Sequence, residues 1–269
     1  MEKILVLDFG GQYNQLIARR VRDHHVYAEI LPYTTPIETI KENGYKGIIF
    51  TGGPNSVFDM SSPHYTKDIL ELGVPVLGIC YGCQLIAWMG DGKVETAPVS
   101  EYGKIEVTVG ESKLFKDIPE KSVTWMSHTD YIAEPPKGYE IIAHTDDCPC
   151  AAMQNTQKNI YAVQFHPEVT HSVYGKEILH NFLYEICRCS GDWVMDNFIE
   201  NTVKSLREKI GDKFQHADIS TIPEEVMSEI RKIKVQFDNC EIKPARIINN
   251  KLICEEKARE PVCVGGEER

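Results

Sequence analysis

The chain has 269 residues, of which 42% are hydrophobic and 26% are charged, and this is an ordinary globular composition. Its 40 acidic and 29 basic residues give a net charge of −11. This acidic balance argues against binding to nucleic acid or to an anionic membrane surface, because both need clustered Lys and Arg.

No targeting segment is recognisable in the sequence. The apolar run in "MEKILVLDFGGQ" is too short for a signal peptide, and no later segment approaches the roughly 18 apolar residues that a membrane-spanning helix needs. We therefore expect a cytoplasmic protein without a membrane partner. Its nine cysteines are then expected to be free thiols, because disulfides are rare in reducing compartments.

Strands and helices are predicted to alternate over the first third of the chain. Continuous apolar runs indicate strands buried on both faces, and apolar residues at helical spacing indicate the helices between them, with arginines on the solvent face of the first. The strands are expected at 3–9, 27–33, 47–53 and 74–80, and the helices at 11–25, 64–73 and 81–90. This order predicts a parallel sheet with helices on both faces.

The middle of the chain changes character. Strand-like segments joined by short, turn-rich connections predict an antiparallel addition to the sheet. These strands are expected at 104–109, 123–128, 139–145 and 158–165, followed by a helix at 173–189. The predicted fold class is therefore α/β, an open, mostly parallel twisted sheet flanked by helices, with an antiparallel extension.

A further helix is predicted after the sheet. Asp192 is typical of an N-cap, and the apolar residues of 193–210 recur at multiples of four along one stripe. The expected organisation is a domain over 1–190, a connector helix over 191–212, and a tail over 213–269 of unknown fold, with one helix around 223–234.

The segment "VLGICYGCQL" contains the strongest chemical signal. Cys80 stands where a buried strand is expected to turn into a helix, between Gly78 and Gly82. This Gly-x-Cys-x-Gly pattern is a cysteine version of the nucleophile elbow, in which a tight turn leaves no room for side chains beside the nucleophile. The helix N-terminus would favour the thiolate form. A buried structural cysteine is the plain alternative.

The segment "AVQFHPEV" offers a base for this nucleophile. His166 and Glu168 are two residues apart at the end of an expected strand, so both side chains point the same way. One ring nitrogen can face a cysteine while the carboxylate holds the other, as in a catalytic triad.

A Gly-Gly-Pro turn in "FTGGPNS" ends another expected strand. The backbone N–H groups near Gly52 and Gly53, together with that of Tyr81, could form an oxyanion hole. Alone, such a sequence is an ordinary turn; beside the two other elements it indicates function.

These motifs resemble a known family. "TGGPNSV", "GICYGCQL" and "QFHPEVTHS" are similar to the three signatures of class I glutamine amidotransferases, in the family's order. "LDFGGQYNQLIARRVRD" and "PEVTH" resemble the amidotransferase domain of GMP synthetases in particular. The resemblance covers about residues 1–212 and implies the flavodoxin-like fold of that family.

The resemblance also implies roles for individual residues. Cys80 would attack the side-chain amide of L-glutamine, His166 would act as base and then as acid toward the leaving ammonia, and Glu168 would orient His166. Gly53 and Tyr81 would supply the oxyanion N–H groups. The glutamine-binding residues implied are Gly52, Gln84, Ser127 and His128. The product would be ammonia for the ATP-dependent amination of XMP to GMP in purine biosynthesis.

Two positions depart from the family pattern. Gly11 stands where serine is usual, and this change is expected to leave the triad intact. Thr129 stands where glycine is usual, and it would alter the glutamine pocket if that position required a positive φ.

The Cys80–Cys83 pair admits other interpretations. A redox Cys-x-x-Cys would leave the His-Pro-Glu and Gly-Gly elements unexplained. Structural zinc would need a second pair, and the candidates have an unsuitable Cys-x-Cys spacing: Cys148 with Cys150, and Cys187 with Cys189. We expect no metal site, and Cys83 is interpreted as a small buried side chain.

The tail carries no recognisable nucleotide site. The chain contains neither the "SGGVDSS" loop of ATP pyrophosphatase domains nor a Gly-x-x-x-x-Gly-Lys loop. ATP and Mg²⁺ are therefore expected only in a partner, the ATP pyrophosphatase domain or subunit of a GMP synthetase. Two alternatives remain open: a non-catalytic or regulatory fragment that binds a synthetase, and an amidotransferase subunit for a different acceptor.

Overall fold

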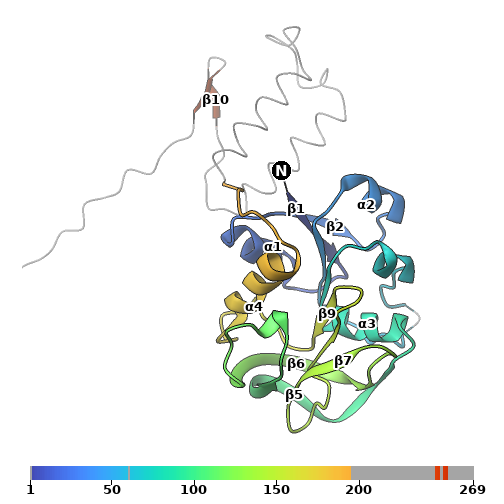
Figure 1. Cartoon of the computed structure of the whole chain (residues 1–269). Coiled ribbons are helices and arrows are strands. Elements are labelled where there is room, and N and C mark those ends of the chain that lie inside the picture. Colours follow the sequence, from blue (N-terminus) through green and yellow to red (C-terminus); the bar gives the residue numbers. More distant parts are fainter. Residues whose placement is uncertain (1, 60, 195–245, 249–250, 254–269) are drawn as a thin grey trace, which may run out of the picture. The chain divides into compact units, whose positions relative to one another are not determined.

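The computed structural model describes residues 2–59, 61–194, 246–248 and 251–253 (Figure 1). The chain divides into two units, Met1–Val194 and Met195–Arg269. In the second unit the described residues form an antiparallel hairpin of β10 (Arg246–Ile248) and β11 (Lys251–Ile253). Most of the connector helix expected over 191–212, and the helix expected around 223–234, lie outside the described residues. Residues 191–194 are described and are not helical.

The first unit is built on one nine-stranded sheet in the order β2-β1-β3-β4-β9-β8-β7-β5-β6. Its five parallel strands are β1 (Lys3–Asp8), β2 (Tyr27–Pro32), β3 (Gly47–Phe50), β4 (Val76–Ile79) and β9 (Ile160–Val163). The antiparallel part comprises β5 (Lys93–Val109), β6 (Lys121–Glu134), β7 (Glu140–His144) and β8 (Ala152–Asn155). The predicted fold class is thus confirmed.

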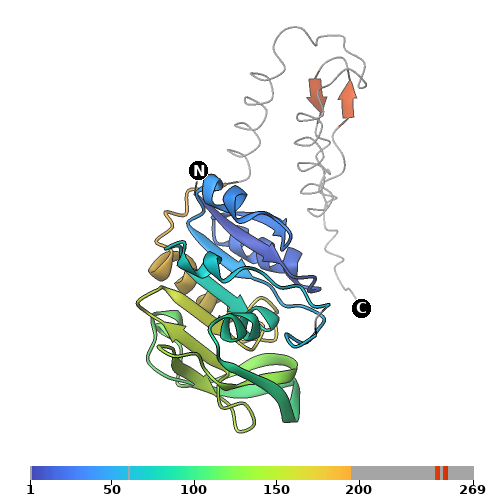
Figure 2. The same cartoon turned by 90° about the vertical axis from the view of Figure 1, so that its right-hand side faces the viewer.

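Helices cover both faces of the sheet (Figures 1 and 2). The α-helices are α1 (Asn14–Asp23), α2 (Ile37–Asn43), α3 (Tyr81–Met89) and α4 (Gly175–Asn181). Shorter helical segments are η1 (Lys67–Glu71), η2 (Lys113–Phe115) and η3 (Phe182–Ile186), the last continuing α4 as a π-helix.

The alternation along β1 explains these two layers. Ile4 and Val6 belong to the hydrophobic core that also contains buried residues of α1 and α4. Leu5 and Leu7 point the other way, into the core that contains buried residues of α2, α3 and η1. A strand covered on both faces is apolar at nearly every position, and this is why β1 appears in the sequence as a continuous apolar run.

Several elements differ from the prediction. The helix expected at 64–73 is only the five-residue 3-10 helix η1, because just Ile69 and Leu70 are buried there. The helix α2, the strand β8 and the first half of β5 were not predicted from the sequence. Among the described residues, no helix has the length and apolar character needed to cross a membrane.

Candidate active site

Cys80 lies in a tight turn between β4 and α3. Its backbone has φ 53° and ψ −108°, a conformation that non-glycine residues rarely adopt, and it forms the N-cap of α3. A Cβ at Gly78 would come within 2.6 Å of the Gly82 carbonyl oxygen, and a Cβ at Gly82 would come within 2.6 Å of the Phe50 carbonyl oxygen. The turn therefore requires both glycines, as predicted for a nucleophile elbow.

His166 and Glu168 lie next to this turn because β9 is the parallel neighbour of β4. His166 follows the end of β9, and its Nδ1 is 2.7 Å from Glu168 Oε1. The Cys80 side chain is close enough to the same ring to raise its pKa. The structure thus brings the three residues predicted as a triad into one contiguous chain of contacts.

The electrostatic surroundings favour a protonated His166. Burial by itself would lower the pKa of this imidazole, but hydrogen bonds and charge interactions with Cys80 and Glu168 outweigh burial and raise the pKa to about 11. Both His166 and Glu168 are almost fully buried, so these interactions act with little solvent screening. The second carboxylate oxygen of Glu168 is buried without a hydrogen-bond partner among the described residues.

The His-Pro-Glu segment is fixed from both sides. On one side, Arg20 of α1 donates from Nε to the Glu168 carbonyl oxygen at 3.0 Å, and the Tyr13 ring packs edge-on against His166 at 5.2 Å. On the other side, Ser172 donates from Oγ to the His166 carbonyl oxygen at 2.6 Å. Arg20 was predicted on the solvent face of its helix, and this prediction was wrong, since its side chain is mostly buried against the segment.

The Gly-Gly turn follows β3, the other neighbour of β4. A Cβ at Gly52 would lie 3.5 Å from His166 Cε1 and 3.8 Å from the Cys80 Cβ, so this glycine faces both residues. A Cβ at Gly53 would lie 2.9 Å from the Tyr81 ring. Tyr81 is the first residue of α3, and its N–H consequently has no acceptor within the helix. The turn and the start of α3 converge on Cys80.

The Tyr81 side chain supports the Gly-Gly turn. Its hydroxyl donates to the Pro63 carbonyl oxygen at 2.7 Å, and burial raises the pKa of the phenol to about 12. The ring is therefore neutral and fixed, and the backbone of the turn packs on it.

A pocket of about 490 Å³ opens beside Cys80, a volume within the usual range for small-molecule sites. It is lined by Gly53, Pro54, Asn55, Ser56, Cys80, Tyr81, Gln84, Tyr102, Ser127, His128, Thr129 and Asp130. Most of the predicted oxyanion and glutamine-binding residues are in this lining. Gly52, His166 and Glu168 are not part of the lining.

Gln84 is built into the pocket wall. Its Nε2 donates to the Asp130 carbonyl oxygen at 2.7 Å and to Gln164 Oε1 at 3.1 Å. Gln164 Nε2 in turn is 3.8 Å from Cys80 Sγ, and Cys80 Sγ is 3.7 Å from the Ser127 carbonyl oxygen. With both amide hydrogens engaged, only the side-chain oxygen of Gln84 remains for a ligand. Gln164 was not singled out in the sequence.

The two departures from the family pattern lie near the site, Thr129 in the pocket lining and Gly11 against the Gly-Gly turn. Thr129 has no positive φ, so a non-glycine residue fits there without backbone strain, and its Oγ1 is 2.7 Å from the Tyr102 hydroxyl. Gly11 packs against the backbone of Gly52, and a Cβ at this position would collide with the Gly52 carbonyl oxygen.

The cysteines in the described part of the chain are all free and buried. Burial raises the pKa of Cys83 well above its ordinary value, so its thiol is neutral and unreactive. This agrees with the interpretation of Cys83 as a small buried side chain.

Comparisons with known proteins agree with the family resemblance of the motifs. Residues 5–186 match the model of the family described as glutamine amidotransferase class-I. The chain is 58% identical over 213 residues to "GMP synthase [glutamine-hydrolyzing]" of Clostridium botulinum, covering 79% of this chain and 42% of that protein. The corresponding protein of Lachnospira eligens is 56% identical over 211 residues, covering 78% of this chain and 40% of that one.

A solved structure is similar as well. The crystal structure of a protein from Thermoplasma acidophilum, described as a putative GMP synthase component, has a TM-score of 0.61 and 32% identity, covering 70% of this chain and 94% of that one. The chain spans about 42% of the length of the Clostridium relative that it matches.

Proposed function

Because this chain belongs to the glutamine amidotransferase class-I family, we propose that it hydrolyses L-glutamine and supplies the ammonia to a GMP synthetase. The observation that carries the proposal is the grouping of Cys80, His166 and Glu168 at the ends of two adjacent parallel strands, with His166 hydrogen-bonded to Glu168 and interacting with Cys80. A degenerate, non-catalytic copy would have no chemical need to keep these three groups together, and no observation favours that alternative.

The proposed reaction begins with the Cys80 thiolate, whose Sγ attacks the side-chain carbonyl carbon of glutamine. The resulting oxyanion would accept hydrogen bonds from the N–H groups of Gly53 and Tyr81. His166 would then give its proton to the amide nitrogen, ammonia would leave, and a γ-glutamyl thioester would remain. Water would hydrolyse the thioester with His166 as base, which releases glutamate and restores the thiolate.

The pocket beside Cys80 is proposed to hold the amino-acid end of glutamine. Backbone groups of Ser127 and His128, the Gly52 backbone and the Gln84 side-chain oxygen would bind its α-amino and α-carboxylate groups. These partners are dipoles rather than charges, and such groups can fix orientation in a site of this size.

The acceptor is inferred from the relatives. Two of them are described as glutamine-hydrolysing GMP synthases and are more than twice as long as the part matched here. We therefore propose that XMP, ATP and Mg²⁺ bind to an ATP pyrophosphatase domain or subunit that acts together with this chain. The amination of XMP to GMP, a step of purine biosynthesis in the cytoplasm, would need both parts.

The test combines two assays on the purified chain. Glutamate release from glutamine should be measurable, should rise when a separate synthetase domain is added with XMP, ATP and Mg²⁺, and should disappear in Cys80→Ala but not in Cys83→Ala. With Cys80→Ala, GMP should still form when ammonium salt replaces glutamine. The proposal fails if the folded chain binds glutamine but hydrolyses none of it even with the synthetase and its nucleotides present.

A further inference from the structure

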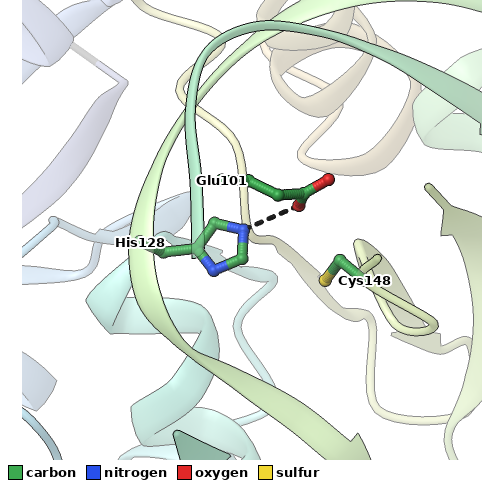
Figure 3. Close-up of side chains that lie close together, drawn as sticks. All are labelled: Glu101, His128 and Cys148. Atoms are coloured by element: carbon green, nitrogen blue, oxygen red, sulfur yellow. Dashed lines mark hydrogen bonds and ion pairs between the residues drawn. The ribbon is translucent and has the colours of Figure 1, made fainter. Parts of the chain in front are cut away.

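A second group of titratable side chains lies outside the triad and includes His128, which lines the pocket. Glu101 of β5, His128 of β6 and Cys148, which follows β7, are buried and bring one ligand-type atom each within 4.8 Å of the others. Figure 3 shows the His128 ring turned toward the Glu101 carboxylate, with the Cys148 thiol beside them. Thr145 completes the group, because its Oγ1 donates to Glu101 Oε1 at 2.6 Å. The proposed reaction uses none of these side chains.

The hydrogen bonds determine where the protons are. His128 Nδ1 is 3.0 Å from the Asp130 carbonyl oxygen, and a carbonyl can only accept, so Nδ1 carries a proton. His128 Nε2 is 2.9 Å from Glu101 Oε2, and one proton lies between these two atoms. The pair has no net charge whichever atom holds that proton. Its polar atoms are satisfied inside the fold, as buried groups require.

This pair acts where the strand ladder is interrupted. Thr96 pairs with Asp130 and Glu101 pairs with His128, and the register shifts between these two pairs. Such an irregularity leaves residues of β5 without regular ladder bonds to β6. The Glu101–His128 pair is the first ladder pairing beyond the irregularity, so its side-chain hydrogen bond reinforces the backbone beside the interrupted stretch.

The backbone held in this way forms one wall of the pocket. The Asp130 carbonyl oxygen accepts from both His128 and Gln84, and the Ser127 carbonyl oxygen lies 3.7 Å from Cys80 Sγ. A rotation of His128 would therefore release the segment 127–130 next to the nucleophile.

We propose that the buried Glu101–His128 pair is a positioning device that holds the backbone of residues 127–130 in the shape that binds glutamine. Glu101 acts through His128 and touches neither substrate nor nucleophile. This inference rests on the proposed function, since it concerns the same pocket.

Metal binding by the same three groups is the competing interpretation. Structural zinc takes four donors, and the cluster offers three. Burial and the neighbouring Glu101 charge raise the pKa of Cys148 to about 12, so the thiol keeps its proton. The Thr145 hydroxyl already accepts from the Cys148 N–H at 2.8 Å while it donates to Glu101. The hydrogen-bonded arrangement accounts for these groups without an ion.

The test measures KM and kcat for glutamine in the full chain carrying Glu101→Ala, Glu101→Gln or the control Glu106→Gln. Glu106 lies on the same strand, is exposed, and pairs with Lys121. Glu101→Ala should raise KM roughly tenfold to a hundredfold, because it leaves buried partners unsatisfied, while kcat changes much less. Glu101→Gln should restore KM to within about threefold of the wild type, because the amide can donate to His128 and accept from Thr145.

Two further measurements test the Glu101–His128 pair if the first experiment fails. If Glu101→Ala does not fold, Thr145→Val removes one of the bonds to Glu101 at equal size and should still raise KM. If the wild type hydrolyses no glutamine, the proposed function fails, and calorimetric binding of glutamine to Cys80→Ala with and without Glu101→Ala still tests the pair. Unchanged KM or affinity in these variants, equal damage from Glu101→Gln and Glu101→Ala, or stoichiometric zinc in the purified chain would each overturn the inference.

Discussion

Replacing Gly82 with alanine is expected to impair catalysis far more than folding. The new Cβ would lie 2.6 Å from the Phe50 carbonyl oxygen and 2.7 Å from the Phe50 Cβ. Both atoms belong to β3 in the middle of the sheet, so the start of α3 has to move instead. Reaching an ordinary contact of at least 3.4 Å requires a shift of about 0.8 Å (3.4 minus 2.6), and that shift carries Cys80 with it.

The two consequences have different magnitudes. Overpacking of this kind costs about 1–3 kcal/mol of stability. A displacement of nearly 1 Å at a nucleophile costs on the order of a hundredfold in rate, because the attack geometry is lost. We expect kcat for glutamine hydrolysis to fall by roughly that factor while the protein remains folded.

Gly44→Ala provides a matched control. Gly44 ends α2 with φ 62°, and a Cβ at this position would have no neighbour within 4 Å, so alanine there costs roughly 1–2 kcal/mol through backbone strain alone. Urea unfolding measures the stability of both variants, and glutamate release measures kcat. A Gly82→Ala protein with wild-type kcat, or a Gly44→Ala protein with an equal loss of kcat, would refute the elbow as the reason for this glycine.

Three further outcomes are expected. Cys80→Ser should abolish glutamate release, whereas Cys83→Ser should retain most of it; equal loss in two folded variants would contradict the assignment of the nucleophile. Glu168→Gln should lower the pKa of His166 and reduce kcat roughly 10²- to 10⁴-fold, and a wild-type pH–rate profile in this variant would count against its orienting role. Because the pKa of His166 is raised to about 11, its contribution to the free energy of unfolding is fully present below the unfolded pKa of about 6.5 and is lost as pH rises toward about 11. Thermal unfolding between these limits should show a melting temperature that falls with pH, and Glu168→Gln should reduce this fall. An equally steep fall in the variant would contradict the interaction between Glu168 and His166.

The local features of the site could be predicted from the sequence, because their signals are local. Gly78, Cys80 and Gly82 lie within five residues and encode their own turn, and His166 and Glu168 are two residues apart. The strands β1 to β4 were recognisable from the sequence as members of a parallel sheet, since strands covered on both faces are apolar throughout. The segment 158–165 was expected in the antiparallel part, and this was wrong, because β9 is the parallel neighbour of β4.

The features that were missed depend on contacts between distant parts of the chain. Arg20 was assigned to the solvent face by helical periodicity, yet it donates to a carbonyl 148 residues away. Glu101 has no local signal, because a single glutamate in a strand usually faces water, and only the register with His128 buries it. Strand β8 was not predicted because its buried residues include Gln154 and Asn155, whose polar side chains do not match the apolar pattern of a buried strand.

The pairing of β4 with β9 determines when, during synthesis of the chain, the site can form. The strands pair directly, from Val76 with Ile160 to Ile79 with Val163, although the whole antiparallel part of the sheet lies between them in the chain. A ribosome that has just released Cys80 must add 88 more residues (168 minus 80) before Glu168 emerges, which takes roughly 4–18 s at about 5–20 residues per second. A chain that ends before β9 lacks His166 and Glu168, so under the proposed function a nascent chain of that length has the Cys80 thiol without its base and should hydrolyse no glutamine.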